Sequence, residues 1–321
     1  MNLASTQTTP WLARDLNVDD WLIRIPGEVI EELVSFAEQH DALDFHSRGE
    51  VGAEAGLAGL VRTRQVLAEA RDRIERGHGF VVLDRVPVNS LTEDQCRVIA
   101  WALFSCIGRV VDQKVSGTKV YDVQDKGVEL EYGVRRSITN LDQEFHTDAG
   151  WLDAPPEMIG LFCRAPAEIG GLNQLMSLVG AHESMREEHP EQLKRLYQPF
   201  YWDRQAEHAP DESKMSAQPV FYEEDGKVNA RYYDDYIRNG QGLADEPLDA
   251  AGEEALATFR TVVGRKERMI EFGLQAGQFL LVNNREVAHS RSEFSGPEGR
   301  RSQRHYFRLW SRRKGATTLD G

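Results

Sequence analysis

Short β-rich runs, separated by Gly, Pro, Asn and Asp, dominate the sequence from about residue 117 onward. The runs are TKVYDV, EMIGLFCR, NQLMSLVG, PVFYEEDGKVNARYY, QFLLVNN and RHYFRLW. Two segments with helical character interrupt them, at about 180–197 and 249–268. Many short strands joined by turn residues are typical of a β-barrel or a β-sandwich. The sequence therefore predicts a β-rich core with helical inserts.

The first third of the chain predicts helices packed against this core. Residues 27–40 and about 59–77 place apolar side chains near helical spacing, and GFVVLDRV then reads as a strand. Ser90 and Glu93 have the spacing of a capping box ahead of the helix EDQCRVIAWALFSCIG.

The expected domain boundaries follow from the change from helical to β-rich sequence. No internal repeat, low-complexity segment or clear linker divides the chain. We therefore expect a single domain over 1–321, with a helical N-terminal region at 1–110 and the β core with its helical inserts at 111–313.

Composition narrows the classes of protein. Asp and Glu outnumber Lys and Arg by 52 to 38, for a net charge of −14, which disfavours binding to a nucleic-acid backbone. No apolar run reaches the roughly 18 residues of a membrane span, and the N-terminus lacks the pattern of a signal peptide. We therefore expect a cytoplasmic protein that binds neither membrane nor nucleic acid. The three cysteines, Cys96, Cys106 and Cys163, are expected to be reduced core residues.

The stretch EFHTDAGW places His146 and Asp148 two residues apart. In an extended strand, residues i and i+2 point to the same face, so an imidazole and a carboxylate would project together and could chelate a divalent ion. In a chain this acidic, one such pair is also expected by chance. His189-Pro190-Glu191 is read as that chance case, because Pro fits the start of a helix.

A third ligand and two arginines follow near the C-terminus. His289 comes after the apolar strand 278–282 and a turn. In RHYFRLW, strand alternation puts Arg304, Tyr306 and Arg308 on one face. If that face points into a barrel, the two arginines need anionic partners, and a small dicarboxylate would satisfy them. Two histidines and one carboxylate on one side of a metal are the arrangement of non-haem Fe(II) oxygenases.

These segments resemble a known enzyme family. TNLDQEFHTDAGWLDAPPEMIGLFCRAPAEIGG, NNREVAHSR and RHYFRLW are similar to the TauD/TfdA superfamily of Fe(II)/2-oxoglutarate dioxygenases, over roughly residues 80–312. Within it, the chain looks closest to the branch with clavaminate synthase-like oxygenases and gamma-butyrobetaine hydroxylase. The resemblance implies a double-stranded β-helix, or jelly roll, with added helices, and it implies Fe(II), 2-oxoglutarate and O2 as cofactor and co-substrates.

The resemblance also assigns roles to particular positions. His146, Asp148 and His289 match the iron ligands, and Arg304 matches the arginine that binds the distal carboxylate of 2-oxoglutarate. Arg308 matches a frequent second arginine near that site. Where relatives usually carry Thr or Ser for the same co-substrate, this chain has Asn173, whose amide can still donate a hydrogen bond.

Substrate residues are expected in the segments before the His-x-Asp pair and in the mid-chain insert. Glu144, two residues before His146, is predicted to share its face and to meet a substrate ammonium, while Arg136 or Arg231 could meet a substrate carboxylate. The full set of candidates is Gln113, Tyr121, Arg136, Glu144, Trp151 and Arg231.

The expected function is therefore hydroxylation of an unactivated C–H bond in a small polar molecule, most simply an amino acid or a derivative. A desaturase or a cyclase would use the same centre, and a non-catalytic metal-binding sensor of small molecules is a rival from another class. An oxygenase acting on nucleic acid fits the net charge poorly. The sequence leaves substrate identity, the position and stereochemistry of attack, and the oligomeric state open.

Overall fold

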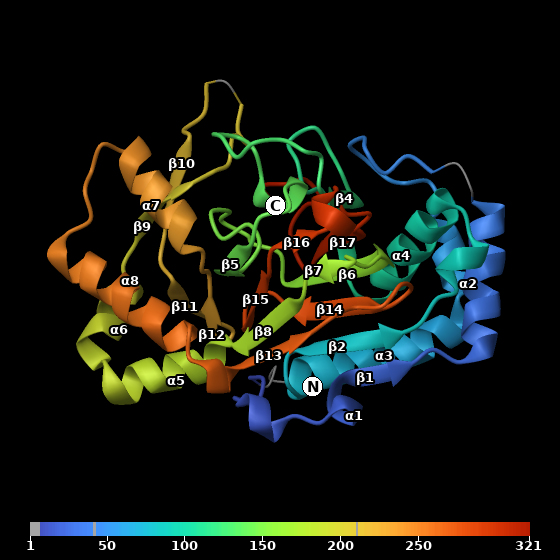
Figure 1. Ribbon diagram of the computed structural model, residues 1–321, viewed down its shortest axis with the longest axis horizontal. Coiled ribbons are helices and arrows are strands. Elements are labelled where there is room, and N and C mark those ends of the chain that lie inside the picture. Colours follow the sequence, from blue (N-terminus) through green and yellow to red (C-terminus); the bar gives the residue numbers. More distant parts are fainter. Residues whose placement is uncertain (1–6, 41–42, 210) are drawn as a thin grey trace.

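The computed structural model describes residues 7–40, 43–209 and 211–321, which form a mixture of helices and strands around two sheets (Figure 1). One apolar cluster contains side chains from both sheets, among them Leu161 and Leu280 of the larger sheet and Leu175 of the smaller one. The two sheets therefore pack against each other through a shared core.

The larger sheet has the strand order β1-β2-β14-β6-β17-β3, and β4 also pairs with β17. Its strands are β1 (Leu22–Arg24), β2 (Phe80–Asp84), β3 (Arg109–Val111), β4 (Tyr121–Gln124), β6 (Met158–Ala165), β14 (Phe279–Asn283) and β17 (His305–Arg312). Only the β1–β2 pair is parallel. Three strands from the first 111 residues thus join strands from the rest of the chain in one sheet.

Helices from the N-terminal third cover the outer face of this sheet (Figure 1). The helices of this part are α1 (Val18–Trp21), α2 (Gly27–Gln39), α3 (Val61–Arg76) and α4 (Glu93–Ile107). Strand alternation sorts the side chains: Phe307 and Leu309 belong to the cluster beneath the helices, whereas Tyr306 and Trp310 belong to the cluster between the sheets. The predicted alternation of RHYFRLW is confirmed.

The smaller sheet is antiparallel, in the order β13-β8-β15-β5. Its strands are β5 (Gln143–His146), β8 (Asn173–Ser177), β13 (Met269–Phe272) and β15 (Val287–Arg291). Three two-stranded ribbons accompany it: β7 (Ile169–Gly170) with β16 (Phe294–Ser295), β9 (Phe200–Asp203) with β10 (Met215–Gln218), and β11 (Phe221–Glu224) with β12 (Lys227–Ala230). The remaining helices are α5 (Leu178–Glu188), α6 (Pro190–Leu196), α7 (Asp234–Leu243) and α8 (Ala250–Val263).

Two local expectations are corrected. The capping box of α4 is formed by Thr92 and Gln95, not by Ser90 and Glu93: Thr92 Oγ1 accepts from Gln95 N at 3.2 Å, and Gln95 Oε1 accepts from Thr92 N at 3.0 Å. Ser90 instead ends a 3₁₀ turn. The first helical insert is two helices, because Pro190 begins α6 directly after α5. The reading of the His189 motif as a helix start is thereby confirmed.

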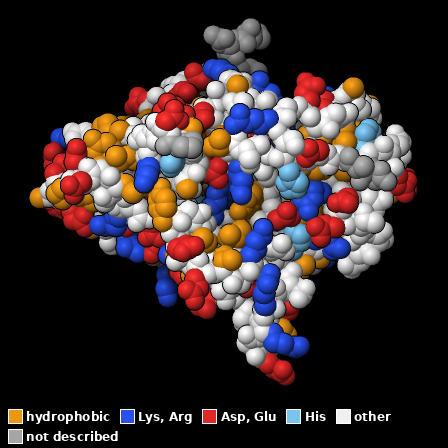
Figure 2. Space-filling model, turned by 90° about the horizontal axis from the view of Figure 1, so that it is seen from above, with side chains coloured by type: hydrophobic (Ala, Val, Ile, Leu, Met, Phe, Trp, Pro, Cys, Tyr) orange, Lys and Arg blue, Asp and Glu red, His pale blue; other side chains and the backbone are white. Residues whose placement is uncertain are grey.

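Charged side chains of both signs share the surface. Lys/Arg and Asp/Glu side chains are interspersed over the face shown in Figure 2, among the residues that the structure describes. No helix in the described part of the chain combines the length and the apolar character needed to span a bilayer. The three cysteines are free, with Cys96 and Cys163 buried.

Candidate active site

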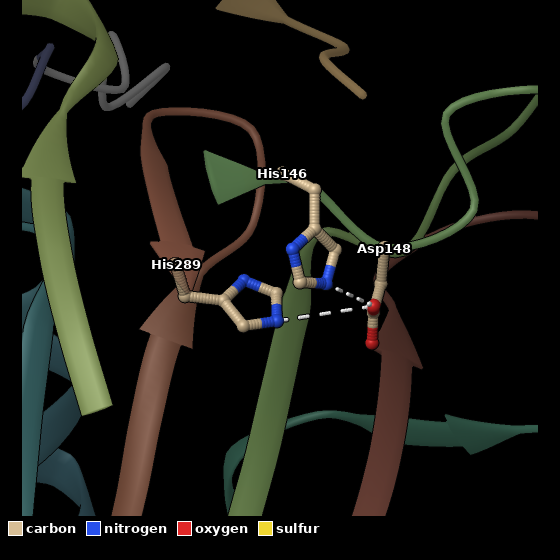
Figure 3. A group of neighbouring side chains, drawn as sticks. All are labelled: His146, Asp148 and His289. Carbon is tan, nitrogen blue, oxygen red and sulfur yellow. Dashed lines mark ion pairs between the residues drawn. The ribbon is translucent and has the colours of Figure 1, made fainter. Parts of the chain in front are cut away.

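His146 and His289 are direct partners across two antiparallel strands. The register pairs His289 of β15 with His146 of β5, and the ring centroids lie 4.1 Å apart. Paired residues on neighbouring strands share a face, so strand pairing alone brings together two histidines that are far apart in the sequence. Both side chains point toward Asp148 (Figure 3).

Asp148 joins the histidines from a turn, not from the strand. Strand β5 ends at His146, and Ala149 has a positive φ of 55°, so the expected i, i+2 alternation does not place the carboxylate. Asn284, at the end of β14, does so: its Oδ1 accepts from Asp148 N at 2.8 Å and its Nδ2 donates to Asp148 O at 3.0 Å. Ligand atoms of His146, Asp148 and His289 all lie within 4.8 Å of one another.

The carboxylate of Asp148 is buried and ionised. Burial by itself would raise its pKa, but the charge of Arg308 and the two nearby imidazoles hold the pKa well below its usual range. Trp310 Nε1 donates to Oδ2 at 2.7 Å, and Arg308 Nη1 lies 3.3 Å from the same oxygen. Two residues of β17 therefore keep Asp148 in the charged form that binds metal.

The surroundings of both imidazoles suit metal ligands. Burial, together with the neighbouring His146, lowers the pKa of His289 to about 3. His146 Nδ1 lies 2.8 Å from the carbonyl oxygen of Glu144, which requires a proton on Nδ1. The lone pair of His146 Nε2 then remains free to accept, and it is approached by Gln143 Nε2 at 3.0 Å. A backbone bond that fixes the tautomer in this way is common for metal-binding histidines.

Arg304 lies buried, with 3% exposure, in a separate place between the sheets. Its guanidinium carbon is 3.8 Å from the centroid of the Tyr306 ring. Burial and the charge of Arg304 lower the pKa of Arg291 to about 9. Arg291 follows His289 by two residues on β15, so Arg304 lies close to the strand that carries this histidine. Asn173 pairs with Arg291 across β8 and β15.

Arg308 lies beside Asp148 and not beside Arg304. Its Nε donates to Gln113 Oε1 at 2.9 Å, and Gln113 Nε2 donates back to the Arg308 carbonyl at 2.7 Å. The Tyr121 ring lies 5.0 Å from the Arg308 guanidinium carbon. Gln113 and Tyr121, expected to meet substrate, therefore position Arg308 in this structure.

The other four substrate candidates separate into two groups. Arg136 and Trp151 line the small cavity beside His146 and Asp148. Glu144 does not: its side chain pairs with Arg260 and lines a different cavity, so the expectation that it shares the face of His146 is wrong. Arg231 is occupied by the carbonyls of Leu152 and Asp153, at 2.8 and 3.2 Å.

Several buried polar atoms of the site lack hydrogen-bond partners within the described residues. They indicate which cofactor or co-substrate the site could hold. They are Arg304 Nε and Nη1, Arg308 Nη2, Asn173 Nδ2 and His289 Nδ1. Arg304 forms no ion pair with any described residue, and an uncompensated buried cation is costly, so its guanidinium calls for an anion. His146, Asp148 and His289 would hold a ferrous ion, and Arg304 would bind a carboxylate of an oxo-acid. The side chains present therefore fit the cofactor and the co-substrate.

Residues 43–310 match the family model described as "Taurine catabolism dioxygenase TauD, TfdA family". FR-33289 synthase of Streptomyces rubellomurinus (strain ATCC 31215) is 28% identical over 262 residues, covering 78% of this chain and 74% of that protein. Asparagine oxygenase in complex with Fe(II), 2S,3S-3-hydroxyasparagine and succinate gives a TM-score of 0.67 at 15% identity, covering 93% and 94% of the two chains. The oxygenase OrfP in complex with Fe and alpha-ketoglutaric acid gives 0.65 at 14%, covering 91% and 94%. These two structures establish the likeness of fold.

Proposed function

The chain belongs to the taurine catabolism dioxygenase TauD, TfdA family, and we propose that it is an oxygenase that hydroxylates an unactivated C–H bond of an amino acid or a derivative. The observation that carries the proposal is the convergence of two imidazoles and one carboxylate, from separate segments, within 4.8 Å. Two histidines and one carboxylate with open positions are typical of Fe(II) oxygenases that depend on a co-substrate.

His146, Asp148 and His289 would hold the iron. Iron with 2-oxoglutarate and O2 supplies the oxidising power that cleaves an unactivated C–H bond. His146 and His289 contribute neutral nitrogen ligands, and Asp148 contributes the negative charge that Trp310 and Arg308 orient through 2.7 and 3.3 Å contacts. These outer contacts fix the ligands before any metal binds.

Arg304 would bind the distal carboxylate of 2-oxoglutarate, since its Nε and Nη1 have no partner within the described chain. A guanidinium can donate two parallel hydrogen bonds to one carboxylate. Asn173 Nδ2, also buried and unpartnered, would add a weaker neutral donor. Arg308 would meet an anionic group closer to the metal, because its Nη2 has no partner in the described part of the chain and its Nη1 already contacts Asp148.

Aromatic side chains would exclude water from the metal. Trp151, Tyr233, Tyr236 and Trp310 line the cavity at His146 and Asp148. Tyr233 stacks near His146, with ring centroids 4.9 Å apart. Such walls limit side reactions at an oxidising centre.

We further infer that the two packed sheets form the double-stranded β-helix, or jelly roll, and that 1–321 is one domain. Supporting this, β1, β2 and β3 of the helical N-terminal region complete the same sheet as β6, β14 and β17. A boundary at residue 110 would divide one sheet, so the helical region is treated as part of the oxygenase domain. The protein's interaction partner is proposed to be the small-molecule substrate.

The direct test is incubation with Fe(II), ascorbate and 2-oxoglutarate across a panel of amino acids, measuring succinate and product mass together. Hydroxylation gives succinate and a product heavier by one oxygen atom. A product lighter by two hydrogen atoms would identify desaturation or ring closure instead. No succinate with any member of the panel, in protein shown to bind iron, would favour a non-catalytic sensor.

A further inference from the structure

A second cavity, here called the outer cavity, adjoins the one at the metal ligands. The metal cavity has a volume of only about 20 Å³, which is room for roughly one water molecule. The outer cavity measures about 630 Å³, within the usual range for small-molecule sites. Arg136 and Tyr236 line both. The outer cavity therefore has room for the body of a substrate whose reacting end extends past these two side chains.

In the wall of the outer cavity, the arginines are paired with carboxylates, and further acidic side chains remain. Its basic residues are already paired: Arg136 Nη2 lies 3.3 Å from Asp235 Oδ2, and Arg238 Nε lies 2.8 Å from Asp234 Oδ2. The wall's other acidic residues are Glu131 and Asp203.

Asp203 is the unusual member of this wall. It is 2% exposed and forms no ion pair with any described residue. Among the described residues, its oxygens accept only from Gln205, at 2.8 Å from the backbone N and 3.4 Å from Nε2. A carboxylate has about four acceptor sites, so capacity remains. Gln205 Oε1, on the same wall, is buried and has no partner in the described chain.

A buried carboxylate without a cation is costly to keep in a fold. Burial raises the pKa of Asp203, and the hydrogen bonds from Gln205 and the nearby His208 offset this effect only in part. A positive group delivered by a ligand would satisfy both Asp203 and the amide oxygen of Gln205, because ammonium and guanidinium groups carry several donors and no acceptor.

We propose that Asp203 and Gln205 form the recognition site for a positively charged group of the substrate, a protonated amine or a guanidinium. This inference rests on the proposed function, since it names the substrate class for the same site: an amino acid with a basic side chain, or an amine-bearing derivative. The cation lies at the outer end of the substrate, and the C–H bond that reacts lies toward His146 and Asp148.

The test is anaerobic calorimetric titration of the protein loaded with Fe(II) and 2-oxoglutarate. The probes are L-arginine with its neutral counterpart L-citrulline, and L-lysine with its neutral counterpart L-norleucine. Charge-assisted hydrogen bonds are the strong ones, so the wild type is expected to prefer at least one cationic probe by about 10- to 100-fold. Asp203→Asn keeps an acceptor for Gln205 N and is expected to lose that preference, with little change for the neutral probes.

Two further variants complete the design. Asp211→Asn removes an exposed charge from the same loop and should leave the preference intact. Gln205→Leu removes the second acceptor and should weaken the cationic probe less than Asp203→Asn does. Circular dichroism verifies that each variant is folded.

Two results would overturn the inference: no binding of either cationic probe to the wild type, or neutral probes binding as tightly as cationic ones. A preference that survives in folded Asp203→Asn protein would also overturn it. Iron-dependent consumption of 2-oxoglutarate, measured in the same samples without substrate, reports separately on the proposed function. If that consumption is present while the probes fail, only the cation site is wrong.

Discussion

Asn284 forms two hydrogen bonds with the backbone of Asp148, although 136 residues separate them in the sequence. A third bond runs from Asn284 Nδ2 to the carbonyl of Pro156 at 3.0 Å. Asn284 is 1% exposed. The position of a proposed iron ligand is thus set by an amide at the end of a strand in the other sheet, and no neighbour of Asp148 in the sequence could replace it.

Asn284→Ala should weaken both the fold and the metal site. Buried polar groups left without a partner cost about 1–3 kcal/mol, and loss of a group that orients a ligand typically lowers metal affinity by roughly 10–100-fold. Thermal unfolding and anaerobic Fe(II) titration measure the two effects. The matched control is Asn283→Ala, because Asn283 Oδ1 only accepts from Arg285 N at 3.1 Å. Equal iron affinity in the two variants would contradict the role given to Asn284.

His146→Ala should abolish coupled turnover, since it removes one of the three proposed iron ligands. The sequence offers a natural control in His189→Ala. His189 has the same His-x-acid spacing, but it precedes α6 on the surface and should be dispensable for activity. The measurement is succinate formed per molecule of product. Near-normal turnover by His146→Ala, or loss of iron binding in His189→Ala, would contradict the assignment of His146 as an iron ligand.

Part of this site was predicted from residue types and from a resemblance. A His-x-Asp pair, a later histidine and a following arginine form a rare conjunction, and similarity to the TauD/TfdA superfamily assigns His146, Asp148 and His289 to the iron and Arg304 to 2-oxoglutarate. The structure brings ligand atoms of the first three within 4.8 Å of one another. Where Glu144 points could not be found in this way, because its ion pair with Arg260 of α8 depends on how a helical insert packs beside β5. For Asn284, which directly follows β14, the sequence predicts only a turn.

Arg304→Gln should raise the KM for 2-oxoglutarate strongly. Removing one partner of a buried charge pair costs about 2–5 kcal/mol, which corresponds to roughly 30- to several-thousand-fold in affinity. Without the oxo-acid, the wild-type guanidinium is buried, and its Nε and Nη1 atoms have no hydrogen-bond partner among the described residues. The variant should therefore unfold at a higher temperature than the wild type. Arg300→Gln, at an exposed position, should change neither quantity. A variant with unchanged KM would remove Arg304 from the co-substrate site.

The sequence pattern does not predict that Asp203 lacks a cationic partner. It lies in the run FYWDRQ, in a chain with 52 acidic residues, and nothing in the letters marks it as unpaired. Its isolation arises because β9 and the turn after it direct it into the outer cavity, while nearby Arg204 pairs with Glu212 and Asp320. That no described cationic side chain forms an ion pair with Asp203 is a property of the packed structure.

The buried carboxylate of Asp203, proposed to bind a cationic substrate group, is also expected to lower the stability of the substrate-free protein. Its pKa is raised in the folded protein by burial, so the folded state binds a proton more readily than the unfolded chain does. The ionised form therefore reduces the free energy of unfolding at neutral pH, and this loss disappears as pH falls through the raised folded-state pKa. Without substrate, Asp203→Asn should melt a few degrees above the wild type at neutral pH. That advantage should shrink as the pH is lowered from neutral, because the wild-type carboxyl then becomes neutral as well. Melting curves across this range, with Asp211→Asn as the exposed control, measure the difference. An advantage that grows on acidification, or appears equally in Asp211→Asn, would mean that Asp203 is not the costly buried charge that a cationic substrate relieves.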